Sequence, residues 1–99
     1  MSIMQSADAF GFHIVGAHSD GANIAAAVTL TPPSGASKLL IQALGQNVRY
    51  TLDGTAPTTS LGFQLMAGDP PRIIPVGNDM VIKVIQEAPT ADLEMQWGY

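Results

Sequence analysis

The clearest hydrophobic pattern in this chain is a strict alternation over residues 47–53. Val48, Tyr50 and Leu52 point to one face of an extended chain, and the polar residues between them point to the other. A period of two is typical of a strand with one buried face. We therefore predict a half-buried β-strand in this segment.

The run before it, residues 38–44, is apolar at nearly every position and is a second predicted strand. Only a short connection that begins with Gly45 separates the two runs, and such a connection favours a β-hairpin over residues 38–53. Within the first run, Leu40 and Leu44 lie on the face opposite Leu39 and Ile41. Two large apolar side chains are therefore left on the outward face.

Further strands are predicted where short runs rich in β-branched or alternating apolar residues lie between turn residues. Pro75 has no backbone N–H, so the run that contains it is predicted to lie at a sheet edge. In the last run, apolar residues alternate with Glu94 and Gln96. These predicted strands are residues 63–67, 72–76, 80–86 and 93–97.

The first third of the chain is less regular. Phe10, Phe12 and Ile14 alternate with small or polar residues, which predicts one strand after an irregular start. Residues 16–23 favour a loop. In residues 24–31, three alanines favour a helix, whereas the Val-Thr-Leu-Thr end followed by two prolines favours a strand. We predict a strand there, with a short helix as the alternative.

Seven or eight short strands without a strong helix signal predict an all-β fold. We expect an antiparallel β-sandwich, either immunoglobulin-like or jelly-roll-like. Residues 1–23 are predicted to form an extended N-terminal arm with the first strand, and residues 24–99 the sandwich body. No repeat, low-complexity tract or linker interrupts the sequence, so we expect a single domain.

Charge is scarce in this chain. Four Lys and Arg against eight Asp and Glu give a net charge of −4, and charged residues make up only 12% of the sequence. An ordinary domain has roughly 25%. With 46% hydrophobic residues, such a domain is expected to cover part of its surface with partners. No Lys/Arg cluster is present and the apolar runs are short, so we expect neither nucleic-acid binding nor a membrane segment.

The only clustered candidates for metal ligation or acid–base chemistry are His13, His18 and Asp20. A zinc site needs three or four rigidly held ligands, and this predicted loop offers two imidazoles and one carboxylate. Ordinary surface or interface histidines are the preferred interpretation. The sequence contains no Gly-x-Ser-x-Gly elbow, phosphate-binding glycine loop or cysteine. We therefore expect no catalytic residue, no metal and no cofactor, and hence no enzyme.

Trp97 and Tyr99 are the candidates for an aromatic platform that stacks on a sugar. Trp97 follows the alternation of the last predicted strand, which favours a core or interface position. Aromatic residues make up only 6% of the chain, a thin supply for a carbohydrate-binding face.

The most specific local motif is Arg49-Tyr50-Thr51-Leu52-Asp53-Gly54-Thr55-Ala56-Pro57-Thr58. The motif predicts a strand that is followed by a turn of defined conformation. Asp53 can accept backbone N–H bonds, Gly54 allows a positive φ, and Pro57 stiffens the exit. The residues assigned to this structural turn are Tyr50, Leu52, Asp53, Gly54, Pro57 and Thr58.

The Tyr-Thr-Leu-Asp-Gly-Thr-x-Pro-Thr stretch of this motif resembles the turn of small β-sandwich modules appended to some chitobiases and other secreted glycosidases. The longer stretch from Leu39 to Tyr99, about 60% of the chain, is more similar to small structural proteins of tailed bacteriophages. The further segments that carry this resemblance are Gly62-Phe63-Gln64-Leu65, Ala67-Gly68-Asp69-Pro70 and Gln96-Trp97-Gly98-Tyr99. The resemblance implies no catalytic residues.

It implies a virion structural protein, most concretely a capsid decoration or cement subunit that binds the outer surface of the shell and stabilises it. The expected partners are the major capsid protein and further copies of this chain, with a trimer as the candidate oligomer. The expected location is the capsid surface of the virion, and the host cytoplasm during assembly. The candidate partner-interface residues are Phe10, Phe12, Ile14, Leu40 and Leu44.

Two alternatives remain open at this point. The first keeps the fold and places the chain in the tail, neck or fibre of the virion, although the sequence has no heptad or β-helix repeat. The second is a carbohydrate-binding module, which needs an exposed aromatic platform.

Overall fold

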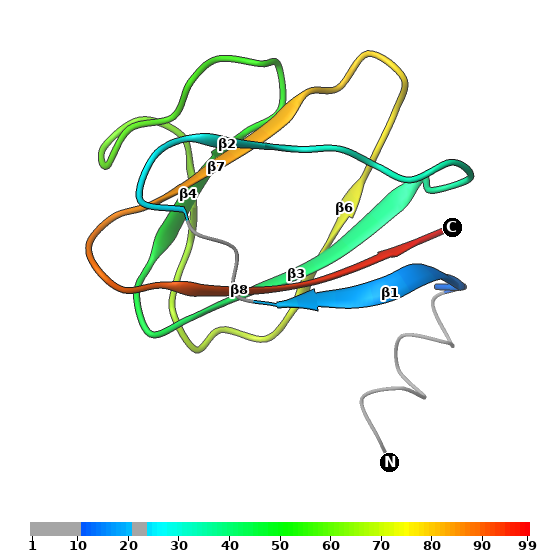
Figure 1. The fold of residues 1–99 in the computed structure, drawn as a ribbon, viewed down its shortest axis with the longest axis horizontal. Coiled ribbons are helices and arrows are strands. Elements are labelled where there is room, and N and C mark those ends of the chain that lie inside the picture. The colour runs from blue at the N-terminus through cyan, green and yellow to red at the C-terminus, as the bar shows by residue number, and fades with distance from the viewer. Residues whose placement is uncertain (1–10, 21–23) are drawn as a thin grey trace.

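The computed structural model describes residues 11–20 and 24–99, and eight β-strands run through them (Figure 1). The strands are β1 (Ile14–Asp20), β2 (Val28–Leu30), β3 (Lys38–Leu44), β4 (Val48–Thr51), β5 (Phe63–Leu65), β6 (Arg72–Pro75), β7 (Ile82–Gln86) and β8 (Asp92–Gly98). None of the described segments forms a helix that is long and apolar enough to span a membrane.

The strands form two antiparallel sheets that pack as a sandwich (Figure 1). Sheet A has the order β1-β8-β3-β6, and sheet B has the order β2-β7-β4-β5. Four pairings are nested in the sequence: β1 with β8, β2 with β7, β3 with β6 and β4 with β5. This is the connectivity of a jelly roll, one of the two sandwich types that the sequence predicts. The predicted all-β sandwich is confirmed.

The core lies between the two sheets because alternation turns every second side chain of the central strands inward. Burying each large apolar side chain stabilises the fold by about 1.5–3 kcal/mol. The central-strand core residues are Leu39, Ile41, Ala43, Leu93, Met95 and Trp97 from sheet A and Val48, Tyr50, Ile82 and Val84 from sheet B. Trp97, predicted at a core or interface position, lies in the core, and the predicted outward positions of Leu40 and Leu44 are confirmed.

Most of the predicted strands are present with small shifts at their ends. β3 spans the predicted residues 38–44, and β8 contains the predicted residues 93–97. β6 is an edge strand of sheet A, as Pro75 predicts. β2 forms inside residues 24–31, so the strand prediction is correct there and the helix alternative is not.

The predicted hairpin over residues 38–53 is wrong. β3 pairs with β8 and β6 in sheet A, whereas β4 pairs with β7 and β5 in sheet B. The connection at Gly45 therefore crosses from one sheet to the other. A Cβ on Gly45 would lie 2.8 Å from the carbonyl oxygen of Thr90, so the glycine permits a close approach at this crossing.

The first strand lies later in the chain than predicted. Residues 16–20, predicted as part of a loop, belong to β1, which begins at Ile14. The register of β1 shifts between Val15 and Ser19, and this irregularity hides the period of two. β1 is an edge strand paired with β8. Residues 1–10, which make up much of the predicted arm, lie outside the described residues.

Candidate interaction face

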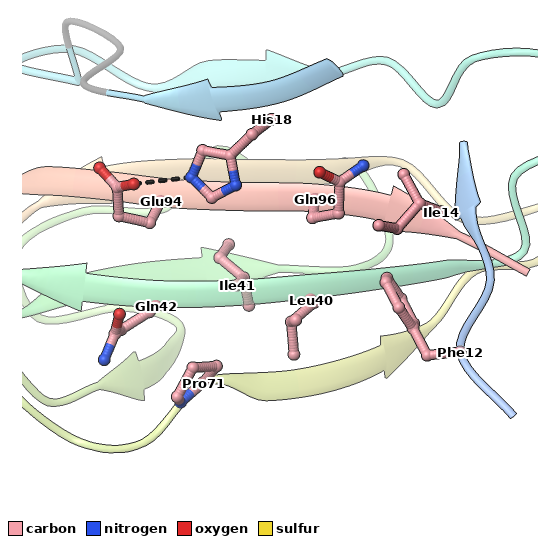
Figure 2. A pocket seen from close by; sticks show the side chains of 9 residues that line it. All are labelled: Phe12, Ile14, His18, Leu40, Ile41, Gln42, Pro71, Glu94 and Gln96. Atoms are coloured by element: carbon pink, nitrogen blue, oxygen red, sulfur yellow. Dashed lines mark hydrogen bonds and ion pairs between the residues drawn. The ribbon is translucent and has the colours of Figure 1, made fainter. Parts of the chain in front are cut away.

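A groove of about 220 Å³ lies on the outer face of sheet A (Figure 2). Its exposed lining is mostly apolar. Large apolar side chains line it from Phe12, Ile14, Leu40 and Pro71. Polar side chains line it from His18, Gln42, Glu94 and Gln96.

The groove follows from the alternation in β3 and β8. Because successive side chains of a strand point to opposite faces, burial of Leu39 leaves Leu40 on the outside. The register pairs Leu40 with Gln96, and the next outward pair along the strands is Gln42 with Glu94. An apolar position and a carboxylate therefore lie in neighbouring rows of one face.

Phe12 closes one end of the groove. Its side chain is buried, yet it lies outside the main core cluster. It packs over Gly98, where a Cβ would lie 2.6 Å from the ring atoms Cε1 and Cζ. Two backbone hydrogen bonds between His13 and Tyr99, of 2.9 and 2.8 Å, hold this segment beside the end of β8.

Three of the five predicted interface residues meet in this groove. Phe12, Ile14 and Leu40 all line it, and the side chain of Ile14 is 54% exposed. Leu44 lies on the same face further along β3 and does not line the groove. Phe10 lies outside the described residues. The role of these residues in binding a partner stays a prediction.

His18 and Glu94 line the polar end of the groove, and a second carboxyl group, that of Asp20, lies beside Glu94 on the neighbouring strand. His18 Nε2 lies 2.7 Å from Glu94 Oε1 (dashed line in Figure 2), and Asp20 is opposite Glu94 in the β1–β8 register. Hydrogen bonding to Glu94 and repulsion by it raise the pKa of Asp20. Hydrogen bonds from Asp20 and His18 lower the pKa of Glu94. Glu94 is therefore ionised at neutral pH, and this end of the groove is negative.

The structure does not bring together His13, His18 and Asp20, the candidates that lie close in the sequence. His18 and Asp20 share Glu94, a partner that the sequence analysis missed. His13 lies at the other end of β8, with its ring stacked on that of Tyr99 at a centroid distance of 5.1 Å. Within residues 11–20 and 24–99, no group of three or more His, Asp or Glu side chains is placed to hold a metal ion.

Gln96 fixes the irregular part of β1 next to the groove. Its Nε2 donates hydrogen bonds to the carbonyl oxygens of Gly16 at 3.2 Å and Val15 at 3.4 Å. These backbone groups lie where the regular β1–β8 ladder is interrupted by the register shift between Val15 and Ser19. The groove wall around His18 is thus held by a side chain that also lines the groove.

The outer face of sheet B is polar by contrast. Arg49 Nε donates to Glu87 Oε2 at 2.6 Å, and Arg49 Nη1 donates to the carbonyl oxygen of Gly62 at 3.0 Å. Gln64 Nε2 donates to the same Glu87 oxygen at 2.7 Å. The hydrogen bonds from Gln64 and Arg49 lower the pKa of Glu87. Polar groups satisfy one another here, so this face offers less to an apolar partner than the groove does.

The assigned structural turn is built from hydrogen bonds to the backbone. Asp53 Oδ1 accepts the N–H of Thr55 at 3.0 Å, and Gly54 has a φ of 87°. The N–H of Gly54 donates to the carbonyl of Val81, and the N–H of Val81 donates to that of Leu52, both at 3.0 Å. The turn is thereby tied to the residues that lead into β7. The hydrogen bond that the Asp53 carboxylate accepts from Thr55 lowers the pKa of Asp53.

An exposed aromatic ring lies beside this turn, and the sequence analysis did not single it out. Phe63 is 61% exposed, and its ring packs against that of Tyr50 with the centroids 5.5 Å apart. A hollow of about 490 Å³ is lined by both rings together with Asp53 and Thr55. Phe63 is on the edge strand β5, opposite Tyr50, and only this pairing places it at the turn.

Comparison of the chain with protein-family models, with curated proteins and with solved structures found no match. The jelly-roll fold is compatible with several functions. Function has to be inferred from the residues and surfaces of the chain itself.

Proposed function

We propose that this chain is a virion structural protein, a capsid decoration subunit that attaches to the shell through the outer face of sheet A. The observation that carries the proposal is the groove in which Phe12, Ile14 and Leu40 lie together. An exposed apolar groove stabilises a complex when a neighbouring protein fills it. The resemblance of residues 39–99 to phage structural proteins supplies the kind of neighbour.

The scarcity of charge supports attachment to a large assembly. Only 12% of the residues are charged, and the outer face of sheet A combines an apolar groove with amide side chains. Interfaces of roughly 800 Å² per partner are sufficient for stable complexes. A subunit that bridges two shell subunits adds buried area, and this area opposes their separation under the pressure of the packaged DNA.

The copy number of the chain in purified virions tests the proposal. Quantitative mass spectrometry against the major capsid protein should give a ratio near one or another large fraction. A few copies per particle would instead place the chain in the tail, neck or fibre. Absence from particles would overturn both virion functions.

The contribution of the N-terminal arm requires a truncation that spares the fold. Because β1 begins at Ile14 and Phe12 packs on Gly98, deletion through residue 15 would remove structural contacts. Deletion of residues 1–10 leaves these contacts in place. If the arm attaches the subunit, this variant keeps its melting temperature and no longer binds particles. If the variant without residues 1–10 binds particles as wild type does, the groove is sufficient for attachment and the arm is not needed.

Carbohydrate binding is a second candidate function, favoured by the exposed ring of Phe63 above the hollow that contains Asp53. An aromatic face beside a carboxylate suits a sugar, because the ring packs on its apolar side and the carboxylate accepts hydroxyl hydrogens. Affinity gels that contain neutral polysaccharides would retard the wild type and not Phe63→Ala. Met66→Ala is the matched control, since Met66 is also exposed but does not line the hollow. Unretarded migration of the wild type would eliminate this function.

A further inference from the structure

We propose that the groove of sheet A receives an extended segment of the shell subunit in which a large apolar side chain is followed two residues later by a lysine or arginine. This inference rests on the proposed function and specifies the chemistry of the partner at the same face. The inference follows from the size of the groove, from the negative charge at one of its ends, and from the spacing between its apolar part and that charge.

The size of the groove fits side chains of a protein. Its volume of about 220 Å³ is below the roughly 300–1,000 Å³ of pockets that enclose a small-molecule ligand. Leu40 and Ile14 give it an apolar lining, and Phe12 limits it at one end. One large apolar side chain that enters from a neighbour would be desolvated on several sides.

The charge of the groove is negative at the end away from Phe12. Glu94 lies there with Asp20 opposite it, and Asp92 is two residues before Glu94 on the same strand face. His18 is bonded to Glu94 and is the one basic side chain of β1 and β8. A cation from a partner would relieve the repulsion between the carboxylates and complete their hydrogen bonding.

The cations of sheet A are engaged elsewhere. Its four strands contain one lysine and one arginine, Lys38 and Arg72. Lys38 Nζ donates to the carbonyl oxygen of Gly11 at 3.2 Å, at the Phe12 end. Arg72 Nη1 donates to the hydroxyl of Tyr50 at 2.8 Å, across to sheet B. Neither side chain neutralises the acidic end of the groove.

The spacing between the two features sets the pattern of the partner. Leu40 pairs with Gln96, and Glu94 pairs with Gln42, so the apolar position and the carboxylate are one row apart on the same face. Successive same-face positions on a strand are about 6.7 Å apart. Residues i and i+2 of an extended chain have the same separation. An apolar residue at i over Leu40 therefore places residue i+2 over Gln42, from which a lysine or arginine side chain reaches Glu94 on the neighbouring strand.

The experiment measures co-sedimentation of the purified chain with phage particles that lack it. Leu40→Asp should weaken binding by about tenfold or more, because it places a charge in the apolar part of the groove. Ile14→Asp should do the same, and it serves as a second variant because Ile14 is exposed and makes little contribution to the core. Glu94→Gln should weaken binding by about three- to tenfold and reduce its dependence on salt between about 50 and 300 mM NaCl.

Ile85→Asp is the matched control for the apolar substitutions, since Ile85 is half-buried on the outer face of sheet B opposite Arg49. Melting temperatures verify that each variant is folded. Wild-type binding that both apolar variants leave unchanged, or that Glu94→Gln leaves unchanged, would overturn the inference and leave attachment to the shell in place. Failure of the wild type itself to bind the particles would overturn the proposed function together with the inference.

Discussion

The ring of Phe12 lies over the backbone of Gly98, on the side of sheet A that faces away from the core. A Cβ at Gly98 would lie 2.6 Å from two ring atoms of Phe12 and 2.6 Å from the carbonyl oxygen of His13. Glycine within a strand often marks such a close approach. The absent side chain of Gly98 admits the aromatic ring that closes the groove.

Gly98→Ala should therefore destabilise the fold. The added methyl group must displace the Phe12 ring and the backbone at His13, which we expect to lower the free energy of unfolding by about 1–3 kcal/mol. Urea unfolding followed by the fluorescence of Trp97, the single tryptophan, measures the change. Gly77→Ala is the control, since a Cβ there has no atom within 4 Å. Equal midpoints for the two variants would contradict the prediction.

Gly62→Ala should be more harmful than Gly68→Ala. Both glycines have a positive φ, of 124° and 84°, so alanine is strained at each by about 1 kcal/mol or more. At Gly62 the new Cβ would also lie 2.9 Å from the carbonyl oxygen of Tyr50, whereas at Gly68 it has no atom within 4 Å. We expect a total loss of about 2–4 kcal/mol at Gly62. Thermal or urea unfolding measures which variant loses more stability, and a larger loss for Gly68→Ala would refute this explanation.

Asp53 should stabilise the fold in a pH-dependent way. The hydrogen bond from Thr55 lowers its pKa in the folded state, so its contribution is present above about pH 4 and is lost as the pH falls through the lowered folded pKa. Asp53→Ala should reduce the free energy of unfolding at pH 7, with a difference from wild type that shrinks as the pH falls below about 4. Asp53→Asn keeps an acceptor oxygen and should recover part of the loss at pH 7. A difference that is constant with pH would exclude this role.

The contribution of Asp20 to stability should depend on pH with the opposite sign. Its pKa is raised in the folded state by hydrogen bonding to Glu94 and repulsion from it, so its effect on stability improves as the pH falls through the raised pKa. The amide of Asp20→Asn can donate to Glu94 at every pH, and this variant should be more stable than wild type at pH 7. The gain should shrink towards about pH 4. Urea titrations of wild type and Asp20→Asn across this pH range test this sign.

Alternation predicts which side chains face the core because it is a local property of an extended chain. It places Leu39 and Ile41 inside and Leu40 outside, as the structure does. It does not identify the neighbouring strand, because the pairing of Leu40 with Gln96 leaves no trace in either segment. The hairpin prediction failed for this reason. In the sequence, Gly45 indicates a tight hairpin connection, whereas in the structure it permits the approach of Thr90 from another part of the chain.

The candidate site was predictable in its apolar members and not in its acidic end. Leu40 stands out in the sequence as a large apolar residue on the outward face of its strand, and Phe12 and Ile14 stand out as apolar members of the first alternating run. The connection between His18 and Glu94 depends on the register of β1, which shifts between Val15 and Ser19. That shift breaks the period of two, so residues 16–20 resemble a loop in the sequence, and the pairing of His18 with Glu94 has no sequence signal.

The position of β8 determines when the chain can fold during its synthesis. This strand is the last in chain order, yet it lies between β1 and β3 in sheet A. Until residues 92–98 leave the ribosome, β1 has no neighbour in its sheet and the inner side of β3 lacks the cover of Leu93 and Trp97. The sandwich therefore closes only after β8 is translated, and the nascent chain carries an unfinished sheet until then.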